Sequence, residues 1–257
     1  MVAQALETRL HDMVSKVQSV VDLDTALADI TQLIGFQYFA LSHHVDICKS
    51  PGNAIRLHNY PASWVENYDK RALGVVDPVH RASHATALGF PWSRLAWLIP
   101  MTRNDKRILE EGRMQGICDG FTVPVHMPGE ARGTCTFATR AERPAPNQQL
   151  LFAQLAGTFA FETARRLWLK RGIVLQPRVP VLTDRQRDCV ILMAQGKSDR
   201  EIAIMLGISR ETVTTHITAA CERYGIFKRQ LLVTLTLYDG TLTFDDVEPW
   251  RYPHFLG

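Results

Sequence analysis

The chain has 257 residues, a length that favours two domains over one. Its hydrophobic fraction of 46% and charged fraction of 21% are close to those of globular proteins and exclude wholesale disorder. The net charge of +3 is too small to indicate a polyanionic partner by itself.

The sequence indicates neither a membrane span nor a signal peptide. No apolar run approaches the ~18 residues that a membrane span needs, and the N-terminus lacks the basic, apolar and small-residue order of a signal peptide. The five cysteines are scattered without a Cys-x-x-Cys pair, which indicates reduced thiols. We therefore expect a cytoplasmic protein without membrane contact.

The basic residues are unevenly distributed. Residues 178–232 carry a net charge of +3, as much as the much longer segment 1–177, whereas residues 233–257 carry −3. A polyanion would therefore bind the segment 178–232 if it binds this chain at all.

The first part of the chain, residues 1–170, alternates between helical and strand patterns. Apolar residues at helical spacing predict a helix over 23–34, ended by Gly35. Aromatic and β-branched residues predict strands over 36–47 and 54–60. Further expected elements are helices over 61–72 and 104–115, a hairpin of strands 121–127 and 132–139, and a long helix over 146–171. This order predicts an α+β fold, an α/β/α sandwich with an antiparallel sheet and helices on both faces.

A linker and a purely helical domain follow. Residues 171–181 are interpreted as the linker, because Gly172 ends a helical pattern and two prolines prevent its continuation. Over 182–238 we expect an all-α domain of four helices, at 184–195, 199–206, 210–224 and 229–238. Thr183-x-x-Gln186 and Ser198-x-x-Glu201 both fit capping boxes at helix starts.

The second and third of these helices have helix-turn-helix proportions, with Gly207-Ile208-Ser209 between them. Val213, Ile217, Ala220 and Tyr224 form one buried stripe on the third helix. The short polar side chains opposite this stripe could contact the edges of DNA bases, and the flanking cationic side chains could bind DNA phosphates. Geometry alone leaves open an ordinary corner of a helical bundle. The candidate DNA-binding residues are Lys197, Arg210, Thr214, Thr215, His216, Thr218, Arg223, Lys228 and Arg229.

The literal residue string favours DNA binding. The chain contains, in this order, the motifs Leu182-Thr183-x-Arg185, Ala194-x-Gly196-Lys197-Ser198, Glu201-Ile202-Ala203, Leu206-Gly207-Ile208-Ser209, Thr212-Val213-x-x-His216, Tyr224-Gly225-Ile226 and Arg229. This string resembles the LuxR-type DNA-binding domain over about 182–238. The resemblance implies a transcription regulator that binds double-stranded DNA as a homodimer, with RNA polymerase as a candidate partner. It assigns helix 229–238, with Leu231, Leu232 and Leu235, to the dimer contact.

The first domain carries a second resemblance. The chain contains, in this order, Tyr60-Pro61-x-x-Trp64-x-x-x-Tyr68, Asp77-Pro78, Trp92, Gly116-Ile117-x-x-Gly120 and Val123-Pro124. This order is similar to that of the acyl-homoserine-lactone receptors of quorum sensing over roughly 20–170. A phospho-receiver domain is disfavoured, because residues 1–60 lack the acidic pair such domains need. A LuxR-like regulator of a non-lactone small molecule stays an alternative, as does a first domain that transforms its ligand.

The residue types suit such a lactone. Asp77 is the expected acceptor for the amide N–H, and the Trp64 indole is the expected donor to the lactone carbonyl. Tyr60, with Thr136, would bind the amide carbonyl, while Tyr68 and Trp92 would provide flat apolar walls. Some receptors have Arg and Thr where this chain has Val65 and Val79. The pocket is therefore expected to be more apolar and less suited to an oxygenated chain.

The histidines and cysteines of the chain give little indication of a metal site or of catalysis. His80 and His84, or His43, His44 and Cys48, lack a convincing third metal ligand, and no nucleophile motif surrounds Cys118 or Cys135. We therefore expect neither metal, cofactor nor enzymatic activity. The extension 239–257 is acidic and then aromatic, with Phe244, Trp250, Tyr252 and Phe255. We expect it to dock on the receptor domain or on a sister chain.

Overall fold

The computed structural model describes residues 2–44, 54–140, 147–170 and 180–248, and the chain forms two compact units divided between Leu175 and Gln176. The expected linker, 171–181, therefore lies almost wholly outside the described residues. Among the described residues, no helix is both long and apolar enough to cross a membrane.

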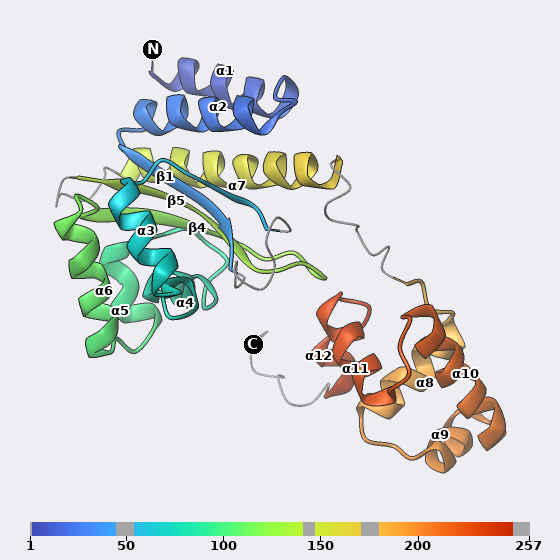
Figure 1. Ribbon diagram of the computed structural model, residues 1–257. Helices are drawn as coiled ribbons and strands as arrows, with labels where there is room; N and C mark the ends of the chain where they lie inside the picture. The colour runs from blue at the N-terminus through green and yellow to red at the C-terminus, as the bar shows by residue number, and fades with distance from the viewer. Residues whose placement is uncertain (1, 45–53, 141–146, 171–179, 249–257) are drawn as a thin grey trace. The chain divides into compact units, whose positions relative to one another are not determined.

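The first unit is built on a five-stranded sheet. Its strands are β1 (Tyr38–His43), β2 (Arg56–His58), β3 (Phe90–Pro91), β4 (Asp119–Val125) and β5 (Gly133–Thr139). They are arranged in the order β2-β1-β5-β4-β3, and every neighbouring pair is antiparallel, which confirms the predicted sheet (Figure 1).

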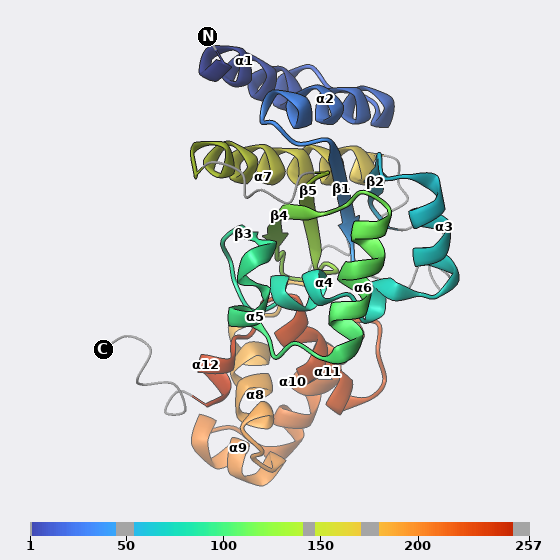
Figure 2. The same ribbon diagram turned by 90° about the vertical axis from the view of Figure 1, so that its left-hand side faces the viewer.

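Helices cover both faces of this sheet, as expected (Figure 2). One face carries α1 (Val2–Ser15), α2 (Val20–Leu33) and α7 (Asn147–Lys170), and the other carries α3 (Ala62–Lys70), α4 (Pro78–Ser83), α5 (Leu95–Leu98) and α6 (Arg103–Met114). The sequence analysis did not predict α1, α4, α5 or β3. The last three are too short for a periodic pattern. In α1, however, the buried residues Leu6, Leu10 and Met13 keep helical spacing.

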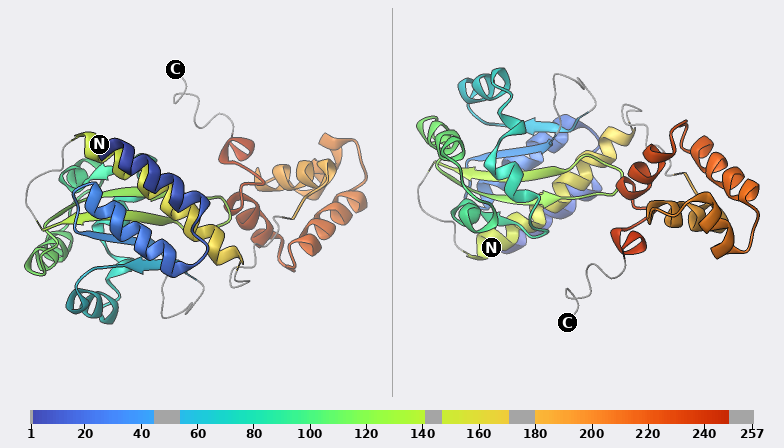
Figure 3. Two further views of the ribbon diagram at one scale, coloured as in Figure 1. Left: turned by 90° about the horizontal axis from the view of Figure 1, so that it is seen from above. Right: turned by 90° about the horizontal axis from the view of Figure 1, so that it is seen from below.

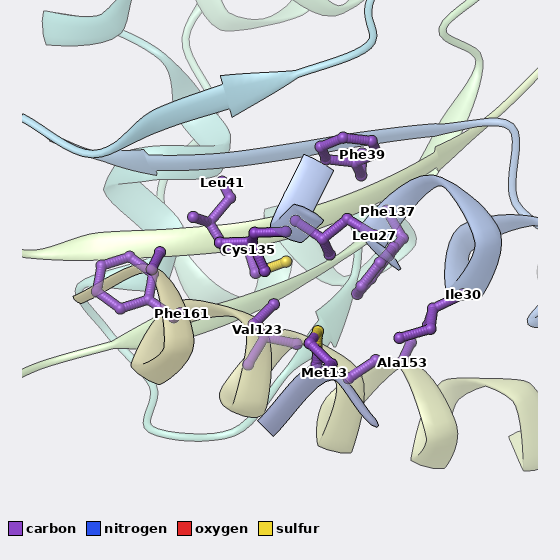
Figure 4. Packing of buried hydrophobic residues seen from close by; sticks show 14 of the residues in the cluster. Met13, Leu27, Ile30, Phe39, Leu41, Val123, Cys135, Phe137, Ala153 and Phe161 are labelled. Atoms are coloured by element: carbon purple, nitrogen blue, oxygen red, sulfur yellow. The ribbon is translucent and has the colours of Figure 1, made fainter. Parts of the chain in front are cut away.

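The main core lies between the sheet and the layer of α1, α2 and α7 (Figure 4). Phe39, Leu41 and Phe137 of the sheet meet Leu27 of α2 there. The buried face of α7 combines small residues, namely Ala153, Ala156, Ala160 and Ala164, with the larger Phe161, Leu167 and Trp168. The small side chains allow α7 to lie close to the sheet. Other large residues of α7 are exposed on a different face of the helix.

An ion pair between a partly exposed arginine and a buried aspartate connects two helices of the opposite layer. Arg81 of α4 donates from Nη1 to both carboxylate oxygens of Asp105 at 2.8 and 3.0 Å. Asp105 also forms the capping box at the start of α6 with Thr102. This pair fixes α4 relative to α6, and with it the loop that carries Asp77.

The second unit is helical, as predicted: α8 (Asp184–Ala194), α9 (Asp199–Leu206), α10 (Arg210–Arg223), α11 (Arg229–Tyr238) and the short α12 (Phe244–Val247) (Figure 3). Both predicted capping boxes are present, at Thr183 and Ser198. Of the expected stripe, Val213, Ile217 and Ala220 are buried in the core of this unit, whereas Tyr224 is only partly buried.

Candidate functional site

A cavity lies on the sheet face opposite the main core. Adjacent residues of a strand point to opposite faces, so the large core residues of β1 and β5 alternate with small ones on this side. The small residues are Ala40, Ser42, Thr134, Thr136 and Ala138, with Gly120 on β4. The cavity leaves about 110 Å³ for the centres of water molecules, several times the ~10–15 Å³ that one water requires. The space therefore suits a small organic molecule.

The residues predicted to bind a ligand meet in this one cavity. Its lining includes Tyr60, Trp64, Tyr68, Asp77, Trp92 and Thr136. They come from α3, β5, the start of α4 and the region after β3, so only the tertiary fold brings them together.

Asp77 is the acceptor at the centre of the site. Its Oδ1 accepts from the Val79 backbone N–H at 2.7 Å, which makes Asp77 the N-cap of α4, and its Oδ2 accepts from the Tyr68 hydroxyl at 2.6 Å. A carboxylate has about four acceptor sites, so two bonds leave capacity for a ligand N–H. Asp77 therefore both starts the helix and lines the cavity.

The two tyrosines remain hydrogen-bond donors. Burial, and then the Asp77 carboxylate, raises the pKa of both Tyr60 and Tyr68 well above the ordinary value. Tyr68 uses its proton on Asp77, whereas the Tyr60 hydroxyl makes no hydrogen bond to any described residue. Tyr60 is thus the hydroxyl with a proton to offer a ligand carbonyl.

Trp92 lines the cavity and also starts a chain of hydrogen bonds that reaches Thr136. Its Nε1 donates to Thr122 Oγ1 at 3.0 Å, and Thr122 Oγ1 lies 3.0 Å from Thr136 Oγ1. When Thr122 donates to Thr136, the Thr136 proton is free to point into the cavity. Gly120 makes the placement of Trp92 possible, because a Cβ there would lie 2.7 Å from the indole ring. The sequence analysis missed Thr122; the strand register that pairs it with Thr136 was its only signal.

The lining is also more polar than the sequence indicated. Val65 and Val79, which stand where some lactone receptors have Arg and Thr, do line the cavity. The cavity is lined in addition by polar residues that were not predicted, namely Ser42, Arg56, His58, His80 and Thr134. The expectation that the pocket is less suited to an oxygenated chain stays a prediction.

Histidines gather beside this end. The His44 ring stacks on His80 with 3.8 Å between centroids, and its Nδ1 lies 3.0 Å from His84 Nε2. Burial lowers the pKa of His44, and the neighbouring histidines lower it further. Within the described residues no group of three or more His, Cys, Asp or Glu side chains could hold a metal ion. Cys48 lies outside those residues.

The helix-turn-helix has the geometry its sequence indicated. Gly207 ends α9 in the left-handed conformation at φ 65°, and Ser209 caps α10 by accepting from the Thr212 N–H at 3.1 Å. The face of α10 opposite the buried stripe is polar. Of the nine candidates, all are exposed except His216, which is partly buried; they are Lys197, Arg210, Thr214, Thr215, Thr218, Arg223, Lys228 and Arg229.

Four of these candidates already have hydrogen-bond partners, and one of them is Thr215, whose hydroxyl donates to the Glu211 carbonyl at 2.9 Å. Asp199 accepts two bonds from the Arg229 guanidinium and one from Thr214 at 3.3 Å. Arg223 donates to the Val181 carbonyl at 2.9 Å. The Arg229 hydrogen bond, and after it the positive charge of Arg229, lowers the pKa of Asp199, although burial acts in the opposite direction. Among the described residues, Lys197, Arg210, Thr218 and Lys228 are the exposed candidates whose side chains make no hydrogen bond to another residue.

Helix α11 and the first part of the extension contribute to the core of the second unit. Leu232 is fully buried in the core of its own domain, so it is not part of an exposed dimer surface, whereas Leu231 is exposed. Of the extension, 239–248 also packs on its own domain. Leu242 is buried there, Asp246 accepts from Arg187 at 2.9 Å, and Tyr224 donates to Asp239 at 2.8 Å. Trp250, Tyr252 and Phe255 lie outside the described residues.

Comparisons with known proteins match both units. Residues 19–164 match the family of the autoinducer binding domain, and residues 180–236 match that of the bacterial regulatory proteins, luxR family. The transcriptional activator protein VanR of Vibrio anguillarum is 28% identical over 227 residues, which cover 85% of this chain and 90% of VanR. The transcriptional activator protein LuxR of Aliivibrio fischeri is 22% identical over 91% of this chain and 93% of its own.

Solved structures share the fold. The crystal structure of Escherichia coli SdiA has a TM-score of 0.66 and 20% identity, and the match covers 93% of this chain and 98% of SdiA. SdiA in complex with octanoyl-rac-glycerol gives 0.64 at 20% identity, with 92% and 94% covered. The unit with the cavity matches the autoinducer binding domain, and the unit with the helix-turn-helix matches the luxR family. The chain belongs to the LuxR family of transcription factors, which are not enzymes, and it joins an autoinducer-binding domain to a LuxR-type helix-turn-helix domain.

Proposed function

We propose that this regulator binds an N-acyl-homoserine lactone in the cavity of its first domain and binds a two-fold-related promoter site as a dimer. The observation that carries the proposal is the meeting of Asp77, Tyr60, Trp64 and Thr136 around one cavity. The protein would act in the cytoplasm, where both DNA and a diffusible lactone are within reach.

The polar groups match the polar atoms of a lactone one by one. Asp77 has acceptor capacity for the amide N–H, and Tyr60 has a free proton for the amide carbonyl. Trp64 is buried on α3 with an indole N–H that can only donate, which suits the lactone carbonyl. Such a bond to a charged acceptor contributes about 1.5–3 kcal/mol, so Asp77 carries much of the recognition.

DNA binding rests on α10. Its Arg210 and its exposed threonines present short polar groups on one face, while Val213 and Ile217 anchor the other. In a dimer, two such helices reach successive major grooves of a two-fold site. The lactone acts only through different affinities for the DNA-competent and incompetent states.

The dimer contact we propose lies on α7. Leu151, Leu155 and Phe159 follow one another at four-residue spacing and are 69%, 48% and 39% exposed. They stand opposite the small-residue face that packs on the sheet. A second copy of this chain would cover this apolar stripe. Exposed Leu231 on α11 is a further candidate contact.

A gel shift tests the whole proposal. The full chain is titrated onto its own promoter region with and without a panel of lactones of different acyl length. We expect one group of lactones to change the DNA affinity at least tenfold, in either direction. No change with any lactone, together with a different small molecule recovered from the purified protein by mass spectrometry, would establish the alternative of a non-lactone signal. The SdiA complex with octanoyl-rac-glycerol is the observation that keeps this alternative open.

A further inference from the structure

One end of the ligand cavity is lined by hydrogen-bonding side chains that the lactone head does not use. Ser42 of β1 pairs with Arg56 on β2 and with Thr134 on β5, so these three form one cross-strand row. His58 of β2 and His80 of α4 lie beside it, and all five line the cavity. We call these five residues the polar end.

The polar end lies beyond the reach of a substituent near the amide. In the proposed binding mode the amide carbonyl faces Thr136, and Thr134 is two residues further along β5, which corresponds to about 6.6–6.8 Å. A substituent on the third carbon of the acyl chain stays closer to Thr136 than a later substituent does, and the same cavity is lined by Val65 and Val79. The polar end therefore faces a later part of the acyl chain.

Some polar atoms at this end lack a protein partner. His58 Nδ1 is buried and makes no hydrogen bond within the described part of the chain. His80 Nδ1 lies 3.1 Å from the Gly74 carbonyl, which can only accept, so Nδ1 donates there and Nε2 is the ring nitrogen left for a ligand group. A buried polar atom without a partner costs about 1–3 kcal/mol, which a ligand group that bonds to it recovers.

The charge at the polar end favours an uncharged ligand group. Arg56 already donates from Nη2 to Asp69 Oδ1 at 2.6 Å, so its charge is compensated. Burial, and then the charge of Arg56, lowers the pKa of His58 and favours the neutral imidazole. A ligand carboxylate would find no uncompensated cation here, whereas a hydroxyl can both donate to and accept from a neutral imidazole.

We propose that the cavity selects acyl-homoserine lactones whose acyl chain carries a hydroxyl group beyond its third carbon, bound by His58 with Ser42 and His80. This inference rests on the proposed lactone recognition. It assigns the specificity of the regulator to the polar end and leaves the lactone head to the residues around Asp77.

The test compares three lactones at each even chain length from six to ten carbons, with an unsubstituted end, a terminal hydroxyl or a terminal carboxylate. Binding to the full chain is measured by calorimetric titration. We expect the hydroxylated lactone of at least one length to bind tenfold or more tightly than both of its counterparts. His58→Leu should remove this preference, whereas His58→Gln, which keeps hydrogen-bonding capacity, should retain part of it.

Controls separate the two ends of the cavity. Thr136→Val should weaken the hydroxylated and unsubstituted lactones by equal factors, because it acts on the head. If His58→Leu does not fold, Ser42→Ala gives the same comparison with a smaller expected loss of preference. Equal binding of the three lactones, or tightest binding of the carboxylate, overturns this inference alone. Binding of no lactone overturns it together with the proposed function.

Discussion

Leu242 tests whether the C-terminal extension is part of the DNA-binding domain. This side chain is 1% exposed and lies in the same core as Val213 and Ile217. Removing a fully buried leucine side chain costs about 2–5 kcal/mol, so Leu242→Ala should lower the free energy of unfolding of this domain by that amount. Since 1.4 kcal/mol corresponds to tenfold, amides that exchange by unfolding of the domain should exchange about 30-fold faster or more.

The assay is hydrogen exchange of the full chain, followed by mass spectrometry on peptides from α8 and α10. Phe244→Ala is the matched control, because Phe244 lies two residues away and is 66% exposed. Surface substitutions of this kind usually change stability by less than about 0.5 kcal/mol. If Leu242→Ala changes the exchange of α8 and α10 no more than Phe244→Ala does, the extension does not stabilise the domain and the reasoning fails.

Three further predictions concern the ligand, the dimer and acid stability. Asp77→Asn should weaken lactone binding by about 1.5–3 kcal/mol and leave the melting temperature nearly unchanged, because asparagine caps α4 equally well; an unaltered dose–response in the titration would reject the assigned pocket. Leu151→Glu should yield a folded monomer in analytical ultracentrifugation, since this side chain is 69% exposed within the chain, and a persisting dimer would place the contact elsewhere. The Arg229 hydrogen bond lowers the pKa of Asp199 from its ordinary value of 3.8, so the pair stabilises the fold above that pH and loses its effect as the pH falls through the lowered value. Arg229→Gln should therefore lower the melting temperature at neutral pH but not in strong acid, and a deficit that persists unchanged in acid would contradict the linkage.

Local patterns in the sequence determined the helices of the DNA-binding domain and their ends. Capping boxes at Thr183 and Ser198 act over three residues, so each can be found in the sequence without knowledge of the fold. The buried stripe of α10 follows from helical periodicity for the same reason. The ligand-contacting candidates were found through short motifs whose residue types match the chemistry of a lactone.

The tertiary structure decided which side chains share a space. Strand register sets Ser42 beside Arg56 and Thr134, and a shift of β1 by one residue would turn Ser42 to the main core. No local pattern encodes that register, so the polar end of the cavity and the role of Thr122 escaped the sequence analysis. Leu232 shows the same limit: periodicity marks it as apolar, but only packing decides between the core of its own domain and a surface for a partner.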